Sequence, residues 1–97
     1  MDYTKFDEYI GEQLYVARVT KHLTLSNMAE LLTAKLIISN DKRQKVSLPG
    51  YQCYEKGTRS IPNQVLKYAC EILKLDTFTV IKNASEKYIE AIEKQCK

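Results

Sequence analysis

The chain of 97 residues has no tryptophan, one histidine, three glycines and two prolines. It contains no glycine-rich phosphate-binding loop, and no cysteine stands beside the single histidine, His22. Nucleophilic and acid–base sites depend on such pairings of reactive groups. Unless residues far apart in the chain assemble a site, the sequence predicts no enzyme, no cofactor and no metal, and we expect His22 at the exposed end of a helix.

Disulfide and membrane signals are also missing. Cys53, Cys70 and Cys96 are odd in number and widely spaced, without a paired metal-binding motif, which favours reduced thiols in a cytoplasmic protein. No apolar run is long enough for a transmembrane helix. The acidic start, residues 1–3, is unlike a signal peptide. We therefore expect a cytoplasmic protein with no membrane partner.

The length predicts one domain over residues 1–97, with a core over 5–82, an inserted basic loop over 33–46 and a C-terminal helix over 85–97. A single core of this size is modest, so dimerisation would help it.

Charge is unevenly distributed along the chain. The net charge is +3, but residues 1–12 carry a balance of −3 and residues 35–59 a balance of +4. A basic segment is either an electrostatic surface for an anionic partner or a solvated loop.

Hydrophobic spacing predicts two helices in the first third of the chain. The first runs from Lys5 to Thr20, and the second starts near Leu25 with Thr24 or Ser26 as its cap. The residues expected to face the core are Phe6, Ile10, Leu14 and Ala17 in the first helix and Met28, Ala29 and Leu32 in the second.

A short helix is predicted between Ser47 and Gly57. Ser47 is a good N-cap, Pro49 is tolerated in a first turn, and Gly57 suits a left-handed C-terminal residue. Tyr51 and Tyr54 are three residues apart and share one face, which we interpret as the core side.

Two or three helices are predicted after Gly57. One runs from Ile61 or Pro62 to Leu75, with Ser60 as a cap, and Val65, Leu66, Ala69, Ile72 and Leu73 on its inner face. Asp76-Thr77 then precedes a shorter fifth helix that includes Phe78, Val80 and Ile81. A separate C-terminal helix from Ser85 places Tyr88, Ile89, Ile92 and Cys96 on a stripe that lies on the core or on a second subunit.

Two stretches, Leu23–Leu32 and Tyr54–Pro62, resemble the XRE/Cro-type helix-turn-helix family of phage repressors. The resemblance spans residues 10–32 and 46–82. It implies an all-α, five- to six-helix lambda-repressor-like domain in which the helix from Ser47 is the recognition helix. It also implies an ion pair between Arg18 and Glu55, at positions where some family members hold one.

The chain departs from the family between the second and third helices. Residues 33–46 are about ten longer than the usual helix-turn-helix turn. Either Leu36–Ile38 extend the second helix, with an exit at Asn40-Asp41 and an exposed basic loop, or Leu36–Ser39 pair with Gln44–Leu48 as a small hairpin. The four-residue steps from Met28 to Leu36 favour the extension slightly.

The resemblance also assigns a DNA-binding surface. Its residues are Thr24, Ser26, Asn27, Lys42, Arg43, Lys45, Ser47, Leu48, Gln52, Lys56, Thr58 and Arg59. Gln52 can hydrogen-bond to adenine, while the basic residues and the amides at the start of the recognition helix suit phosphate. Leu25 and residues 48–50 replace polar residues of the family, so base readout is modest or has moved to the loop at 42–45.

The expected function is a sequence-specific repressor of phage, mobile-element or operon promoters that binds an inverted repeat of double-stranded DNA as a homodimer. The alternative is a protein-interaction module, such as an antitoxin or inhibitor, that meets its partner through residues 48–51 and the inserted loop.

Overall fold

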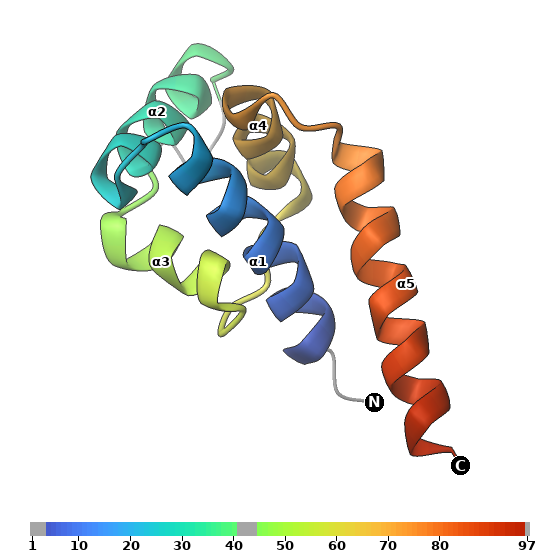
Figure 1. Cartoon of the computed structure of the whole chain (residues 1–97). Coiled ribbons are helices and arrows are strands. Elements are labelled where there is room, and N and C mark those ends of the chain that lie inside the picture. The colour runs from blue at the N-terminus through green and yellow to red at the C-terminus, as the bar shows by residue number, and fades with distance from the viewer. Residues whose placement is uncertain (1–3, 41–44, 97) are drawn as a thin grey trace.

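A computed structural model of the protein describes residues 4–40 and 45–96, and within them it contains five α-helices and no strand (Figure 1). The helices are α1 (Thr4–Thr20), α2 (Leu25–Ile38), α3 (Leu48–Lys56), α4 (Asn63–Leu73) and α5 (Thr77–Gln95). The predicted all-α class is confirmed. In this part of the chain, no helix is both long and apolar enough to cross a membrane.

The first helix, α1, lies between α3 and α5 and packs on both, as well as on α4 (Figure 1). The expected core faces are confirmed, with Ile10, Leu14, Met28 and Leu32 buried. The buried cluster also contains Leu36, Val46, Tyr51, Val65, Leu66, Ala69, Cys70, Leu73, Val80 and Ala84.

Local capping residues fix most of the helix ends. The Thr24 hydroxyl accepts from the Asn27 N–H at 3.0 Å, and the Asn27 side chain accepts from the Thr24 N–H at 3.1 Å, so Thr24 rather than Ser26 caps α2. The Ser47 hydroxyl accepts from the Gly50 N–H, and Gly57 ends α3 with φ of +76°. His22, with φ of +58°, follows α1 as an exposed, left-handed residue, as predicted.

The start and end of α4 differ from the prediction. Pro62 occupies the N-cap position, and the predicted Ser60 cap is wrong, because the Ser60 hydroxyl donates to Asp7 at 2.7 Å instead. The helix ends at Leu73, before Leu75, because Lys74 adopts a left-handed backbone with φ of +59°.

The inserted segment begins as a helical extension. Leu36 continues the buried face of α2, the helix runs to Ile38, and Asn40 follows with φ of +55°. The hairpin alternative is therefore wrong for Leu36–Ser39. Leu36 lies on the same buried face as Met28 and Leu32 because the helix continues and these residues are four positions apart. The loop at 41–44, with the predicted DNA contacts Lys42 and Arg43, lies outside the described residues.

A side-chain bridge ties the returning segment to α2. The Thr33 hydroxyl accepts from the Val46 N–H at 3.0 Å and donates to the Val46 carbonyl at 3.2 Å. Val46 is buried, so this bridge fixes where the chain enters α3.

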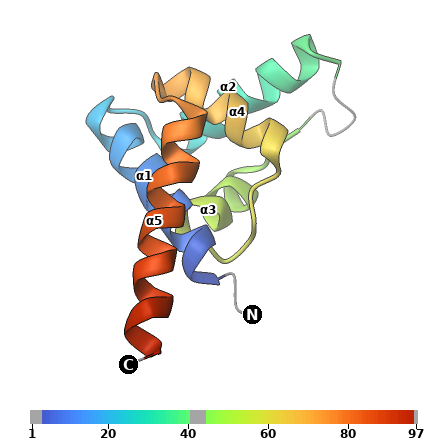
Figure 2. The ribbon, with the colours of Figure 1, turned by 90° about the vertical axis from the view of Figure 1, so that its right-hand side faces the viewer.

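The last two predicted helices are one helix, and their separation at Ser85 is wrong. The Asp76 carboxylate caps α5 by accepting from the Thr79 N–H at 2.9 Å, and the helix then runs unbroken to Gln95. Neither glycine nor proline interrupts it, and Val80 and Ala84 bury the same face against the core. Figure 2 shows that α5 extends past the other helices, in a molecule measuring 48 × 28 × 23 Å.

Candidate nucleic-acid interface

We define the α2–α3 face as the side of the molecule formed by the start of α2, residues 45–47, the outward side of α3 and the two residues after Gly57. It holds every predicted DNA contact in the described part of the chain: Thr24, Ser26, Asn27, Lys45, Ser47, Leu48, Gln52, Lys56, Thr58 and Arg59. A groove of about 750 Å³ between α2 and the start of α3 brings Ser26, Lys45, Ser47 and Leu48 together.

The orientation of α3 follows from its tyrosines. Tyr51 is fully buried and Tyr54 is half-buried against the core. Gln52 and Lys56 are four residues apart and therefore share the opposite, outward side of α3, where Lys56 is exposed and Gln52 is half-buried. A polar amide and a cation thus point outward from a helix whose other side is fixed in the core.

Arg59 folds back along α3. Its Nη1 lies 4.0 Å from the position that a Cβ would take on Gly50, so the guanidinium reaches the first turn of the helix. Thr58, next to it, donates its N–H to the Cys53 carbonyl at 3.1 Å, which closes the end of α3. The loop after Gly57 therefore places the positive charge of Arg59 beside the first turn of α3.

The amides at the start of α3 offer less to a phosphate than the sequence suggested. Pro49 has no N–H, and the Gly50 N–H is already bound to the Ser47 hydroxyl at 3.1 Å. In α2, the capping box likewise occupies the Asn27 N–H. Anion binding on this face therefore falls mainly to side chains.

A bidentate ion pair holds α3 on α1. Arg18 Nε donates to Glu55 Oε2 at 2.7 Å, and Arg18 Nη2 donates to Glu55 Oε1 at 3.1 Å. Arg18 Nη1 also donates to the Leu23 carbonyl at 2.8 Å, so one guanidinium links α1, α3 and the entry to α2. The two side chains are only 13% and 7% exposed, and the hydrogen bond to Glu55 raises the pKa of Arg18.

The Tyr51 hydroxyl lies in the core without a hydrogen-bond partner among the described residues. Burial raises the pKa of Tyr51 far above its usual value of about 10, and the Glu55 carboxylate adds to this effect. Tyr51 therefore cannot meet a protein partner, which removes it from the alternative docking surface at residues 48–51.

Sequence reasoning missed Gly11. A Cβ on this residue would lie 2.2 Å from the Glu55 carbonyl oxygen, so α1 and α3 touch backbone to backbone here. The available signal was a lone glycine within a helical pattern, which often marks a close helix contact.

Charge on the α2–α3 face is mainly positive. Lys45, Lys56 and Arg59 are exposed there, whereas the Glu55 carboxylate is buried in its ion pair. Glu30, which lines the groove, is an exposed carboxylate on the same side.

Large apolar side chains are exposed near the same groove. Ile37 and Leu48 line it with 58% and 40% of their surface exposed, whereas Leu31 and Ile38, which are 42% and 84% exposed, lie on a different side of α2. Such a group of exposed apolar residues is typical of protein-binding surfaces.

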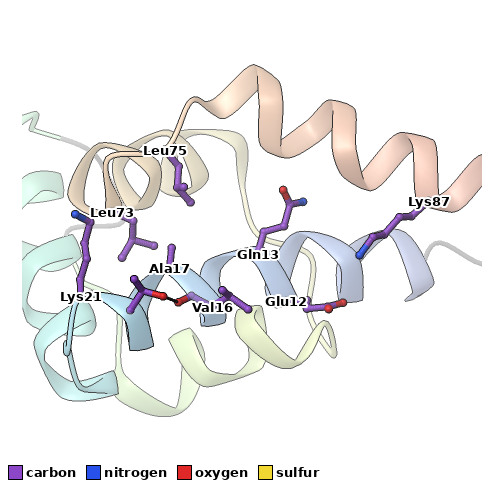
Figure 3. Close-up of a pocket in the computed structure, with 9 residues that line it drawn as sticks. Glu12, Gln13, Val16, Ala17, Lys21, Leu73, Leu75 and Lys87 are labelled. Atoms are coloured by element: carbon purple, nitrogen blue, oxygen red, sulfur yellow. Dashed lines mark hydrogen bonds between the residues drawn. The ribbon is translucent and has the colours of Figure 1, made fainter.

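Another hollow, whose lining is drawn in Figure 3, contains none of the residues of the α2–α3 face. It measures about 480 Å³ and lies between α1, the end of α4 and α5, with Val16, Ala17, Leu73 and Leu75 as its apolar lining. In the described part of the chain, no three His, Cys, Asp or Glu residues are placed to hold a metal ion. Cys53, Cys70 and Cys96 are free thiols.

Comparisons of the chain with protein-family models, with curated proteins and with solved structures found no match. Function is therefore inferred from the geometry of the chain itself.

Proposed function

We propose that the protein is a DNA-binding regulator with a lambda-repressor-like helix-turn-helix arrangement, in which α3 enters the major groove. The observation that carries this proposal is that α3 is held in one orientation, with its polar side facing outward. Its tyrosine side is buried, Arg18 and Glu55 hold it on α1, and Gln52 and Lys56 point outward. A recognition helix needs this combination of a rigid inner side and a polar outer side.

The exposed side chains divide into two roles. Lys45, Lys56 and Arg59 neutralise phosphates and supply the salt-dependent part of the affinity, with Thr24, Ser26, Asn27, Ser47 and Thr58 as polar neighbours. Gln52 hydrogen-bonds to adenine, and Leu48 contacts a thymine methyl group. Because only these two side chains of α3 suit base edges, we expect modest sequence discrimination.

In the cell, such a domain represses transcription from phage, mobile-element or operon promoters. A cytoplasmic homodimer on an inverted repeat, with half-sites about one helical turn apart, places one α3 in each of two successive major grooves.

The test is a titration of labelled duplex with the full chain at several salt concentrations. One duplex carries the region upstream of its own gene, and the other carries the same bases scrambled. We expect tighter binding to the first duplex, with an affinity that falls steeply as salt rises.

Two matched double variants locate the contact surface. Lys56→Ala/Arg59→Ala removes two positive charges from the α2–α3 face and should reduce the slope of log affinity against log salt by about 2. Lys67→Ala/Lys94→Ala removes two exposed lysines from α4 and α5 and should leave the slope unchanged. Equal, weak binding of both duplexes, or equal slopes for the two variants, would contradict the proposal.

A specific observation favours one other function, which is binding of a protein partner by an antitoxin or inhibitor. The exposed residues Ile37 and Leu48, which line the α2–α3 groove, form an apolar surface that DNA phosphates do not require. Ile37→Asp discriminates between the functions, because an added negative charge at this exposed groove position should abolish binding of a protein but reduce DNA affinity by less than about tenfold.

A further inference from the structure

A second apolar stripe runs along the outer side of α5. Phe78, Ile81, Ile89 and Ile92 expose 73%, 37%, 53% and 37% of their surface. At 100° per residue, these positions and Ser85 fall within about 80° of the helix circumference. We call them the α5 stripe.

The α5 stripe is separate from the face by which α5 joins the core. Val80 and Ala84 are buried roughly a third of a turn around the helix from the stripe. On the core side, Gln13 of α1 donates to the Val80 carbonyl at 2.9 Å and accepts from the Asn83 side chain at 3.1 Å. The helix is therefore already anchored, and the stripe is surplus to the folding of one copy.

The spacing of the stripe is symmetric about Ser85. Ile81 and Ile89 lie four residues before and after Ser85, and Phe78 and Ile92 lie seven before and after it. A two-fold axis through Ser85 would therefore place Phe78 of one antiparallel helix level with Ile92 of the other, and Ile81 level with Ile89. The small side chain of Ser85 would meet its own copy at the axis and allow the helices to approach closely.

Charges beside the stripe suit the same pairing. Lys82 and Glu86 are exposed and lie on one flank of the stripe, about 60° and 100° from its centre. In the antiparallel arrangement, like flanks face each other. The two Glu86 side chains then lie two residues apart in height, and Lys82 of one copy lies two residues in height from Glu86 of the other. The axis repeats this contact on the other half of the interface, which gives two opposite-charge sites.

We infer that the α5 stripe binds a second copy of this chain as an antiparallel α5–α5 pair with its two-fold axis at Ser85. A two-fold interface requires one surface to be complementary to itself, and the symmetric spacing provides this. A partner of different sequence would not need such symmetry. The inference does not rest on DNA binding, because α3 and α5 lie on opposite sides of α1 (Figure 1).

The first test measures the mass of the full chain by sedimentation equilibrium over a range of concentrations. We expect a reversible dimer, and Ile81→Asp/Ile89→Asp should raise its dissociation constant at least about 100-fold. Both isoleucines are exposed in one copy, so the helix content by circular dichroism should stay unchanged. Val16→Asp/Val19→Asp, at exposed valines of α1, is the matched control and should dimerise normally.

Cysteine cross-linking tests the direction of pairing, in a background in which exposed Cys96 is changed to serine. Under mild oxidation, Phe78→Cys mixed with Ile92→Cys should form a cross-linked dimer, because antiparallel pairing brings these positions together. Phe78→Cys alone should not. A monomer at every concentration, a dimer unaffected by the aspartates, or self-linking of Phe78→Cys would overturn the inference.

Discussion

At the scale of single residues, Tyr51 shows how burial changes the chemistry of a side chain. The phenol lies in the core beside an ion pair, and its pKa is raised mainly because burial disfavours the charged form. Its hydroxyl has no hydrogen-bond partner in the described part of the chain, so the ring rather than the hydroxyl supplies the stabilising contacts. Removing the oxygen should therefore be tolerated.

This environment predicts a loss of stability in alkaline solution. Below about pH 10, Tyr51 is protonated in both the folded and unfolded states and adds no pH dependence. Above that pH, the unfolded chain releases the proton and the folded chain keeps it, so the free energy of unfolding falls by up to about 1.4 kcal/mol per pH unit. Urea denaturation of the protein and of Tyr51→Phe between about pH 8 and 11 measures this term.

The Tyr51→Phe variant isolates the effect, because every other residue is the same in both proteins. Burial raises the pKa of the Cys70 thiol as well, so Cys70 contributes a decline of the same sign to both curves. The variant should lose stability more slowly as the pH rises. Parallel curves for the two proteins would show that Tyr51 ionises alike in the folded and unfolded states.

At the scale of helices, the contact between α1 and α3 determines the position and orientation of α3. Gly11 permits the two backbones to touch, and the Arg18–Glu55 ion pair fixes α3 further along the same contact. Replacing glycine with alanine inside a helix normally stabilises it by about 1 kcal/mol. Here, a Cβ would lie 2.2 Å from the Glu55 carbonyl oxygen and 2.5 Å from that of Tyr54, so the helices must separate.

We therefore expect Gly11→Ala to have the opposite sign, with a loss of about 1–3 kcal/mol in the free energy of unfolding measured with urea. Gly50→Ala is the control, because its Cβ would meet only the Ser47 hydroxyl, at 3.0 Å, and the Arg59 guanidinium, at 4.0 Å. That change should stay below about 1 kcal/mol. A Gly11→Ala protein as stable as the original would refute the close contact.

Helix ends were more predictable from sequence than helix contacts. Thr24, Ser47 and Gly57 act within a few residues of themselves, so their capping roles could be read from neighbouring residues. The same local reasoning failed at Ser85, where a new helix was predicted to begin. Ser85 instead lies in the middle of α5, because the helix continues with Val80 and Ala84 buried against the core. Gly11 was missed because its partner, Glu55, is distant in the chain.

In the candidate site as well, features set by neighbouring residues were predictable from the sequence, and features set by folded geometry were not. The sequence predicted that Tyr51 and Tyr54 share the core side of α3, since helical periodicity determines this, and the structure leaves Gln52 and Lys56 on the other side. The sequence did not indicate that Arg59 folds back to the first turn of α3, or that Pro49 and the Ser47 cap leave few free amides there. Both features depend on loop and cap geometry rather than on periodicity.

At the scale of the whole molecule, α1 separates two surfaces with different proposed tasks. In the two proposals, the α2–α3 face meets DNA and the α5 stripe meets a second copy. In the structure, α1 is packed between α3 and α5, the helices that carry these surfaces (Figure 1). Changes at sites that share no contacts are usually additive within about 0.3–0.5 kcal/mol. The two proposals can therefore fail independently.

This arrangement predicts how variants combine on DNA recovered by selection from random duplexes. Ile81→Asp/Ile89→Asp should bind a single half-site within about twofold of the original affinity, but should lose the added affinity of the inverted repeat, because that gain comes from linking two copies. Lys56→Ala/Arg59→Ala should weaken binding to both duplexes and leave the dimer dissociation constant unchanged. A quadruple variant that carries all four substitutions should bind the half-site with the same reduced affinity as Lys56→Ala/Arg59→Ala. If the aspartate variant also lost half-site binding, or the lysine–arginine variant also failed to dimerise, α1 would be transmitting changes between the two surfaces rather than separating them.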